Sequence, residues 1–174
     1  MDVQPGIIDR VKNKDEYIAK VNNAVAAAHK NHIQVIYVVV GFRPGFPEAS
    51  DRNKSFRTIK ETIPSHLVNP QPLISPKDGD IVVTKRRISA FAGSDLEVVL
   101  RAGEIIHLVL AGIATSGVVL STLREAADKD YQITVLSDLC ADPDEEVHSM
   151  LLEKIFPRQA TMISSERWIQ EMEK

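Results

Sequence analysis

Apolar positions along this chain follow two different spacings. Between residues 15 and 29, Val21, Val25 and Ala28 recur at the spacing of one helical face. The run 33–40 that follows is β-branched and nearly unbroken, as in a strand buried on both faces. The alternation continues to the end of the chain. It predicts strands at 81–83, 105–110, 132–136 and 160–163, and helices at 94–101, 115–129, 144–156 and 165–173.

Strands that alternate with helices of this length indicate a three-layer α/β/α domain, Rossmann-like, with a mostly parallel central sheet. A length of 174 residues suits one domain with a sizeable core, and we predict a single domain over residues 1–174. Residues 41–79 interrupt the alternation and are rich in proline and glycine. A loop of this length is usually functional or part of an interface, so we expect one of those roles here.

Charge and cysteine content narrow the possible partners. The 21 basic and 24 acidic residues give a net charge of -3, which offers no electrostatic reason to expect a nucleic-acid partner. The longest apolar stretch, 105–120, falls short of the ~20 residues of a membrane helix, and no secretory signal pattern is visible. The single cysteine, Cys140, cannot form an intrachain disulfide and suits a reducing compartment. We therefore predict a cytoplasmic protein without nucleic-acid or membrane partners.

Three short segments carry a family resemblance. They are Met1-Asp2-Val3-Gln4, the segment Val83-Thr84-Lys85-Arg86-Arg87-Ile88-Ser89-Ala90-Phe91, and the turn Gly112-Ile113-Ala114-Thr115-Ser116-Gly117-Val118-Val119. In this order they resemble the three signatures of the isochorismatase-like cysteine hydrolases. The catalytic aspartate, lysine and cysteine of that family correspond to Asp2, Lys85 and Val118. Valine has no lone pair or proton with which to attack a carbonyl, so thiolate chemistry cannot occur at this position.

The resemblance also implies roles for neighbouring residues. It implies that Asp2 and Lys85 form a close pair in the substrate pocket. The alternative is that they form a purely structural ion pair inherited from a catalytic ancestor. It places a cis peptide bond at Ile113-Ala114, with Thr115 completing a turn whose backbone amides would form an oxyanion hole.

Two residues of the long loop are candidates for substrate binding. We expect Phe42 and Arg43 to line the pocket entrance, where an arginine can hold a carboxylate by paired hydrogen bonds. An arginine on a solvated loop or at a subunit interface is an equally good interpretation of Arg43.

Other chemistry finds less support in the residues. Ser116 and Thr115 precede position 118 in the turn and would point elsewhere, and we expect Cys140 to be a small buried thiol. The true isochorismatases of the superfamily also lack the cysteine and protonate carbon from the aspartate, although they carry glycine where this chain has the bulkier Val118. The five histidines show no ligand spacing, so we expect neither a metal nor another cofactor, and we expect His107 to be a core residue.

These observations predict a protein of the isochorismatase-like hydrolase type that acts on a small carboxylated or amide-containing metabolite without a cysteine nucleophile. The alternative is a catalytically silent small-molecule-binding or assembly protein of the same fold. We expect a homodimer or larger homo-oligomer, because the family commonly assembles and the 41–79 loop carries Phe42, Phe46 and Phe56. The family's aspartate ends a central strand, and we expect that strand to be truncated here, since only Met1 precedes Asp2.

Overall fold

The computed structural model describes residues 1–62 and 71–173 of the chain. Its strands are β1 (Ile36–Val40), β2 (Ile81–Lys85), β3 (His107–Ile113), β4 (Gln132–Ala141) and β5 (Thr161–Ile163). Its α-helices are α1 (Lys14–Lys30), α2 (Lys54–Thr62), α3 (Leu96–Ala102), α4 (Leu120–Asp128), α5 (Glu145–Met150) and α6 (Ser165–Met172). Two 3-10 turns (Ile8–Arg10 and Phe156–Arg158) and two π-helical turns (Thr115–Val119 and Leu151–Ile155) complete the described elements. No helix within these described ranges is both long and apolar enough to cross a membrane.

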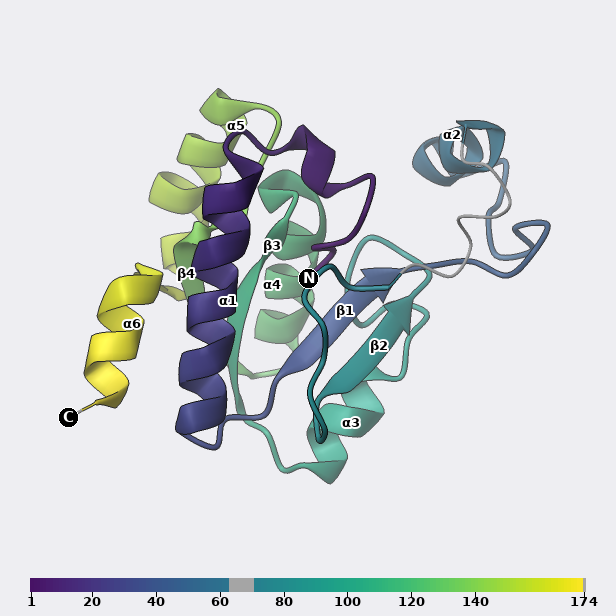
Figure 1. Cartoon of the computed structure of the whole chain (residues 1–174). Helices are drawn as coiled ribbons and strands as arrows, with labels where there is room; N and C mark the ends of the chain where they lie inside the picture. The colour runs from purple at the N-terminus through teal and green to yellow at the C-terminus, as the bar shows by residue number, and fades with distance from the viewer. Residues whose placement is uncertain (63–70, 174) are drawn as a thin grey trace.

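The sheet is parallel and consists of two parts, β1-β2 and β3-β4-β5. The first two residues of the chain join them (Figure 1). The Met1 nitrogen donates to the Ala111 carbonyl at 2.8 Å, and the Ile113 amide donates to the Met1 carbonyl at 3.2 Å. On the other side, the Asp2 amide donates to the Val38 carbonyl at 2.8 Å. Met1 and Asp2 therefore pair with β3 and β1 in the manner of a short central strand.

Close approach of the backbones at this junction requires a glycine in β3. A Cβ added to Gly112, whose φ is +155°, would lie 2.3 Å from the Met1 carbonyl oxygen. That separation is far below van der Waals contact, so a side chain at position 112 would push the two backbones apart. Gly112 thus sets how closely the first residues pack against β3.

Helices cover the sheet on both faces (Figure 1). On one face, Ala24 of α1 packs with Leu136 and Leu139 of β4 and with Trp168 of α6. On the other face lies the largest apolar cluster, in which α3 and α4 contribute residues such as Leu100 and Leu123. The arrangement confirms the three-layer α/β/α fold with a parallel sheet.

Several element boundaries differ from those expected from the pattern. The predicted strand 132–136 continues to Ala141, and the predicted helix 115–129 opens with a π-helical turn at Thr115–Val119. The expectation for His107 was wrong: it lies exposed at the start of β3, where its ring is within hydrogen-bond distance of the Thr134 hydroxyl at 2.9 Å. Ile106, directly before it, is also exposed, and the strand becomes buried only from Leu108.

The long loop contains a small apolar cluster of its own. Phe42 stacks near Phe46 and Phe56, with ring centroids 5.6 and 5.9 Å away, and the Arg87 guanidinium lies 5.0 Å from the centre of the Phe56 ring. All three phenylalanines are buried. They therefore do not form the exposed apolar surface on which the expected assembly was based, and oligomerisation stays a prediction. Residues 63–70 of this loop lie outside the described ranges.

Candidate active site

A buried ion pair lies at the carboxyl ends of the central strands. Lys85 is the last residue of β2, and its Nζ lies 3.0 Å from Oδ2 of Asp2. The two residues expose only 3% and 5% of their surface. The Lys85 ammonium also donates to the Arg87 carbonyl at 3.0 Å. The predicted close pair of Asp2 and Lys85 is therefore present.

Two opposing effects act on the pKa of the Asp2 carboxyl. Burial raises the pKa of the Asp2 carboxyl above its ordinary value, while the charge and hydrogen bond of Lys85 lower that pKa, and burial has the larger effect. Within the described part of the chain, Oδ1 of Asp2 is buried and has no hydrogen-bond partner. Oδ2 of Asp2 thus interacts with Lys85, while Oδ1 is able to accept a further hydrogen bond. A proton, a water molecule or a substrate atom can occupy that position.

A turn at the start of the chain directs Asp2 toward Lys85. Asp2 has a φ of +55°, in the left-handed region that aspartate tolerates better than most residues, and its carbonyl accepts from the Gln4 amide at 3.0 Å. The buried Gln4 side chain then pairs with Val40 of β1. Its Oε1 accepts from the Val40 amide at 3.0 Å and its Nε2 donates to the Val40 carbonyl at 3.2 Å. After Asp2 the backbone turns away from β1, and the Gln4 side chain forms the hydrogen bonds to β1 in its place.

The segment after β2 is fastened to α4, and this holds Lys85 in place. The Ser89 hydroxyl donates to Oε2 of Glu125 at 2.6 Å, and the Ala90 amide donates to the Thr122 hydroxyl at 2.9 Å. Ser89 and Ala90 are both buried. The Ser-Ala-Phe part of the second motif therefore has a structural task, which is to anchor the chain that leaves the lysine.

The turn after β3 contains the expected cis peptide bond, Ile113-Ala114. The Ala114 carbonyl accepts from the amides of Gly117 and Val119 at 3.1 and 3.3 Å, which closes the π-helical turn. Val118 exposes 2% of its surface and packs into the large apolar cluster between the sheet and α4. An isopropyl group thus fills the position that the third motif assigns to the nucleophile.

The hydroxyls beside Val118 are engaged elsewhere. The Thr115 hydroxyl and Nδ1 of His148 lie 2.8 Å apart, and the Ser116 hydroxyl donates to Oδ2 of Asp142 at 2.6 Å. Sequence reasoning missed His148 as a neighbour of the turn. No local pattern reveals this contact, because His148 belongs to α5, 33 residues farther along the chain.

With this geometry in view, comparison with known proteins identifies the family. The family model described as the isochorismatase domain matches residues 1–167. This chain belongs to the isochorismatase family. YwoC, an isochorismatase family protein of Bacillus subtilis (strain 168), is 30% identical over 99% of this chain and 91% of its own length.

A named amidohydrolase and a solved structure are also similar to this chain. The ureidoacrylate amidohydrolase RutB of Yersinia enterocolitica (serotype O:8 / biotype 1B) is 34% identical over 73% of this chain, and the match spans 63% of RutB. The solved structure of an isochorismatase family protein from Burkholderia thailandensis has a TM-score of 0.82 and 27% identity, and it covers 99% of this chain and 93% of that one.

In this isochorismatase-family chain, the two expected substrate-binding residues contact other residues of the long loop. Phe42 is buried in the aromatic cluster of the long loop. Arg43 is exposed and forms a salt bridge with Glu48, which also lies 3.5 Å from Nε of Arg86. The structure therefore places Arg43 beside Glu48, which also contacts Arg86 directly after β2. Its role in binding substrate stays a prediction.

The single cysteine is buried and its thiol is weakly reactive. Cys140 lies near the end of β4, where it pairs with Gly112 of β3, and it is buried. Burial raises the pKa of its thiol to about 12, so the reactive thiolate is nearly absent at neutral pH. Among the residues that the structure describes, no three His, Cys, Asp or Glu side chains are grouped so as to hold a metal ion.

Proposed function

We propose that this protein hydrolyses a small carboxylated or amide-containing metabolite without a cysteine nucleophile, and that Asp2 transfers the proton. The observation that carries the proposal is the buried Asp2 carboxyl, with its raised pKa and its unpartnered Oδ1 next to Lys85. A group that serves as both acid and base works best when its pKa lies near the working pH. Burial moves an aspartate in that direction.

The relatives favour an amide-type substrate. RutB carries the name ureidoacrylate amidohydrolase, and this chain is 34% identical to it over 145 residues. For an amide, Asp2 as carboxylate would accept a proton from the attacking water and then give that proton to the leaving nitrogen. Water supplies the hydroxyl of the product acid, and the proton ends on the product amine or ammonia. Lys85 would stabilise the carboxylate before and after the transfer.

The turn around Ile113, Ala114 and Thr115 would provide backbone donors for the carbonyl oxygen. Such donors stabilise the negative charge that develops when water adds to a carbonyl. Since Asp2 and Lys85 are almost fully enclosed, substrate entry would require local opening of the segments around them.

That enclosure, together with the buried Val118, also favours a second candidate. In it, the ion pair is structural and the protein binds a small molecule, or assembles, without catalysis. Enzymes tolerate buried ion pairs for structural reasons as well, so the two candidates predict the same static contacts and different kinetics.

The decisive experiment is a turnover screen with carbamoyl compounds, primary amides and vinyl ethers of small carboxylic acids, read by released ammonia and by mass spectrometry. We expect turnover by the parent protein and a loss of more than about tenfold in Asp2→Asn, which keeps the shape and removes the carboxyl proton. Asp15→Asn, at an exposed position on α1, is the matched control and should leave turnover unchanged. Turnover by Asp2→Asn within tenfold of the parent would reject the role of Asp2. Ligand binding with no turnover would favour the silent protein.

A second experiment examines whether the site geometry is compatible with the chemistry of the wider family. In a Cys140→Ala background, Val118→Cys places a thiol in the π-helical turn before α4, at the position that the family resemblance pairs with Asp2 and Lys85. A neighbouring cation lowers the pKa of a thiol, so we expect this thiol to react with iodoacetamide faster than free cysteine at neutral pH. Reaction no faster than that of free cysteine would mean that Asp2 and Lys85 are not arranged to activate a nucleophile.

A further inference from the structure

The two outer edges of the sheet differ in how open they are to further pairing. The sheet ends at β5 on one side and at β2 on the other (Figure 1). Natural proteins keep free edges from pairing by short strands, prolines, bulges or exposed charges. Strand β5 is short, with three residues. Strand β2 has five residues in unbroken register with β1, contains no proline, and has one charged residue, Lys85, which is buried.

Backbone groups of β2 point away from the sheet. The Ile81 amide donates to the Val35 carbonyl, so Ile81 faces β1. In a strand, the N–H and C=O of one residue point to the same side, and successive residues point to opposite sides. Val82 and Thr84 therefore direct their backbone groups outward. Within residues 1–62 and 71–173, no strand or loop backbone pairs with them.

A groove runs along this open edge. Val82 and Thr84 line it from β2, Val98 lines it from α3, and Pro47 and Glu48 line it from the long loop. Val82 and Val98 expose 41% and 71% of their surface. The groove thus combines unpaired backbone donors and acceptors with exposed apolar side chains. A site with these properties binds a further extended strand.

Charges at the two ends of β2 favour an antiparallel strand of the same sequence. Residues 77–80, directly before β2, carry one lysine and two aspartates, whereas Arg86 and Arg87 directly follow it. Even with Glu48 beside Arg86, the two ends keep opposite net charge. An antiparallel copy brings its basic end to the acidic end of the first strand, and a two-fold axis repeats this contact. A parallel copy would bring like charges together.

Pairing along the whole strand fixes the register. Because Val83 is the central residue of β2, full-length antiparallel pairing places the two-fold axis there. Val82 then lies opposite Thr84 of the second copy, and Arg86 lies opposite Asp80 of the second copy. Val82 and Thr84 are the residues with outward backbone groups, so each such pair exchanges two hydrogen bonds.

We propose that the open edge of β2 is the interface at which two copies of this chain form a two-fold symmetric dimer, with the β2 strands antiparallel and paired about Val83. The pairing satisfies the outward backbone groups of Val82 and Thr84 and removes the side chains of Val82 and Val98 from solvent. It joins the sheets of the two copies into one. This interface does not depend on the reaction proposed for Asp2.

The first test compares masses by light scattering at micromolar concentration. We expect twice the chain mass for the parent and the mass of one chain for Val82→Pro. Proline removes the outward N–H of residue 82 but none of the bonds between β2 and β1. Ile106→Ser removes another exposed apolar side chain, directly before β3, and should leave the dimer intact.

The second test examines the register. In a Cys140→Ala background, Val82→Cys and Thr84→Cys are prepared separately, mixed, equilibrated and mildly oxidised. In the proposed dimer, the Cα atoms of positions 82 and 84 of opposite copies are about 5.5 Å apart, whereas two copies of position 82 or of position 84 are more than about 7 Å apart. We therefore expect at least about tenfold more disulfide-linked dimer in the mixture than in either variant alone.

Three outcomes would overturn the proposal. A monomeric parent would leave the groove to an extended peptide from another protein. A folded Val82→Pro variant that stays dimeric would assign the interface to a different surface. Equal cross-linking in the mixture and in the single variants would exclude the register about Val83. If Val82→Pro does not fold, the cross-linking experiment decides by itself, because it changes side chains of β2 and keeps every backbone donor.

Discussion

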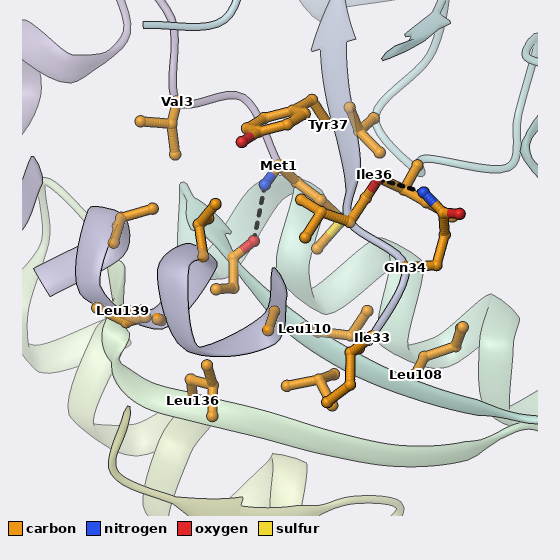
Figure 2. A pocket seen from close by; sticks show the side chains of 18 of the residues that line it. Met1, Val3, Ile33, Gln34, Ile36, Tyr37, Leu108, Leu110, Leu136 and Leu139 are labelled. Carbon is orange, nitrogen blue, oxygen red and sulfur yellow. Dashed lines mark hydrogen bonds between the residues drawn. The ribbon is translucent and has the colours of Figure 1, made fainter. Parts of the chain in front are cut away.

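The polar site formed by Asp2, Gln4 and Lys85 contrasts with a nearby apolar cavity, which we call the apolar slot. Its lining includes Met1, Ile36 and Leu110 (Figure 2). In the polar site, contacts are directional: Lys85 bonds to Asp2 and Arg87, and the Gln4 amide bonds to Val40. In the slot, contacts are made by aliphatic side chains that surround a cavity of about 240 Å³. Hydrogen bonds fix positions to a few tenths of an ångström, whereas apolar contacts tolerate rearrangement. We therefore expect the polar site to respond sharply to single changes and the slot to respond weakly.

The largest effect is expected from Lys85→Met. Removing the cation leaves the Asp2 carboxyl buried without its partner, and breaking a buried pair in this way typically costs about 3–5 kcal/mol of unfolding free energy. Urea denaturation measures the loss. Lys12→Met removes a lysine from an exposed pair with Glu145 and should leave stability unchanged. Equal stability of Lys85→Met and the parent would show that the pair contributes no net interaction.

Truncation of two leucines should show how loosely the slot is packed. Leu123 is fully buried in the cluster between the sheet and α4, and Leu123→Ala should cost about 3–5 kcal/mol. Leu110 borders the existing cavity and has fewer contacts to lose, so Leu110→Ala should cost about 2 kcal/mol. Both values come from the same denaturation experiment. A greater loss at Leu110 would mean that the slot is packed as tightly as the core.

The pH dependence of stability should report the buried Asp2. Its pKa is raised in the folded state, so between the ordinary aspartate range and that raised pKa the folded chain holds a proton that the unfolded chain has lost. In this window, unfolding free energy falls as pH rises, by at most about 1.4 kcal/mol per pH unit. The contribution is complete below the ordinary range and is lost above the raised pKa. In Asp2→Asn this slope should be absent, and an unchanged slope would assign it to another group.

The smallest effect is expected from filling the slot with a side chain from α1. Ala28 lines the cavity, and Ala28→Leu should place part of its side chain there and stabilise the protein by about 0.5–1 kcal/mol. Ala26→Leu, at an exposed position of the same helix, controls for helix propensity. Destabilisation by Ala28→Leu alone would show that the slot cannot adapt to added volume.

The ion pair could be predicted because it depends on topology. Parallel strands bring their carboxyl ends to one edge, so the placement of Asp2 and Lys85 in the motifs was enough to bring them together. The end of β4 could not be predicted in this way. Ser137 and Asp138 interrupt the apolar run, yet the strand continues because each is satisfied by a distant segment: Ser137 donates to the Ile163 carbonyl, and Asp138 accepts from Ser165.

The aromatic cluster of the long loop escaped prediction for a related reason. Phe42 and Phe46 lie in a loop rich in proline and glycine, and Phe56 follows ten residues after Phe46, so no continuous periodic pattern joins the three rings. Only the folded loop brings them together, with Arg87 over the Phe56 ring. Composition indicated an apolar loop, which suggested exposed surface. Three-dimensional packing instead buries these rings within the chain. The same limit applies to the contact between Thr115 and His148, which joins segments far apart in sequence.

Gly112 and Val118 differ in their freedom to evolve. Any residue other than glycine at position 112 begins with a Cβ that meets the Met1 backbone, so every replacement disturbs the junction of the two sheet parts. Position 118 is occupied by a side chain inside an apolar cluster, and a slightly smaller residue such as cysteine can be accommodated there. A lineage with this fold could therefore gain or lose a thiol at position 118 by substitution while the glycine six residues earlier stays constant. In such a protein, substitutions at position 118 can change the chemical reactivity of the site, whereas substitutions at position 112 disturb the fold itself.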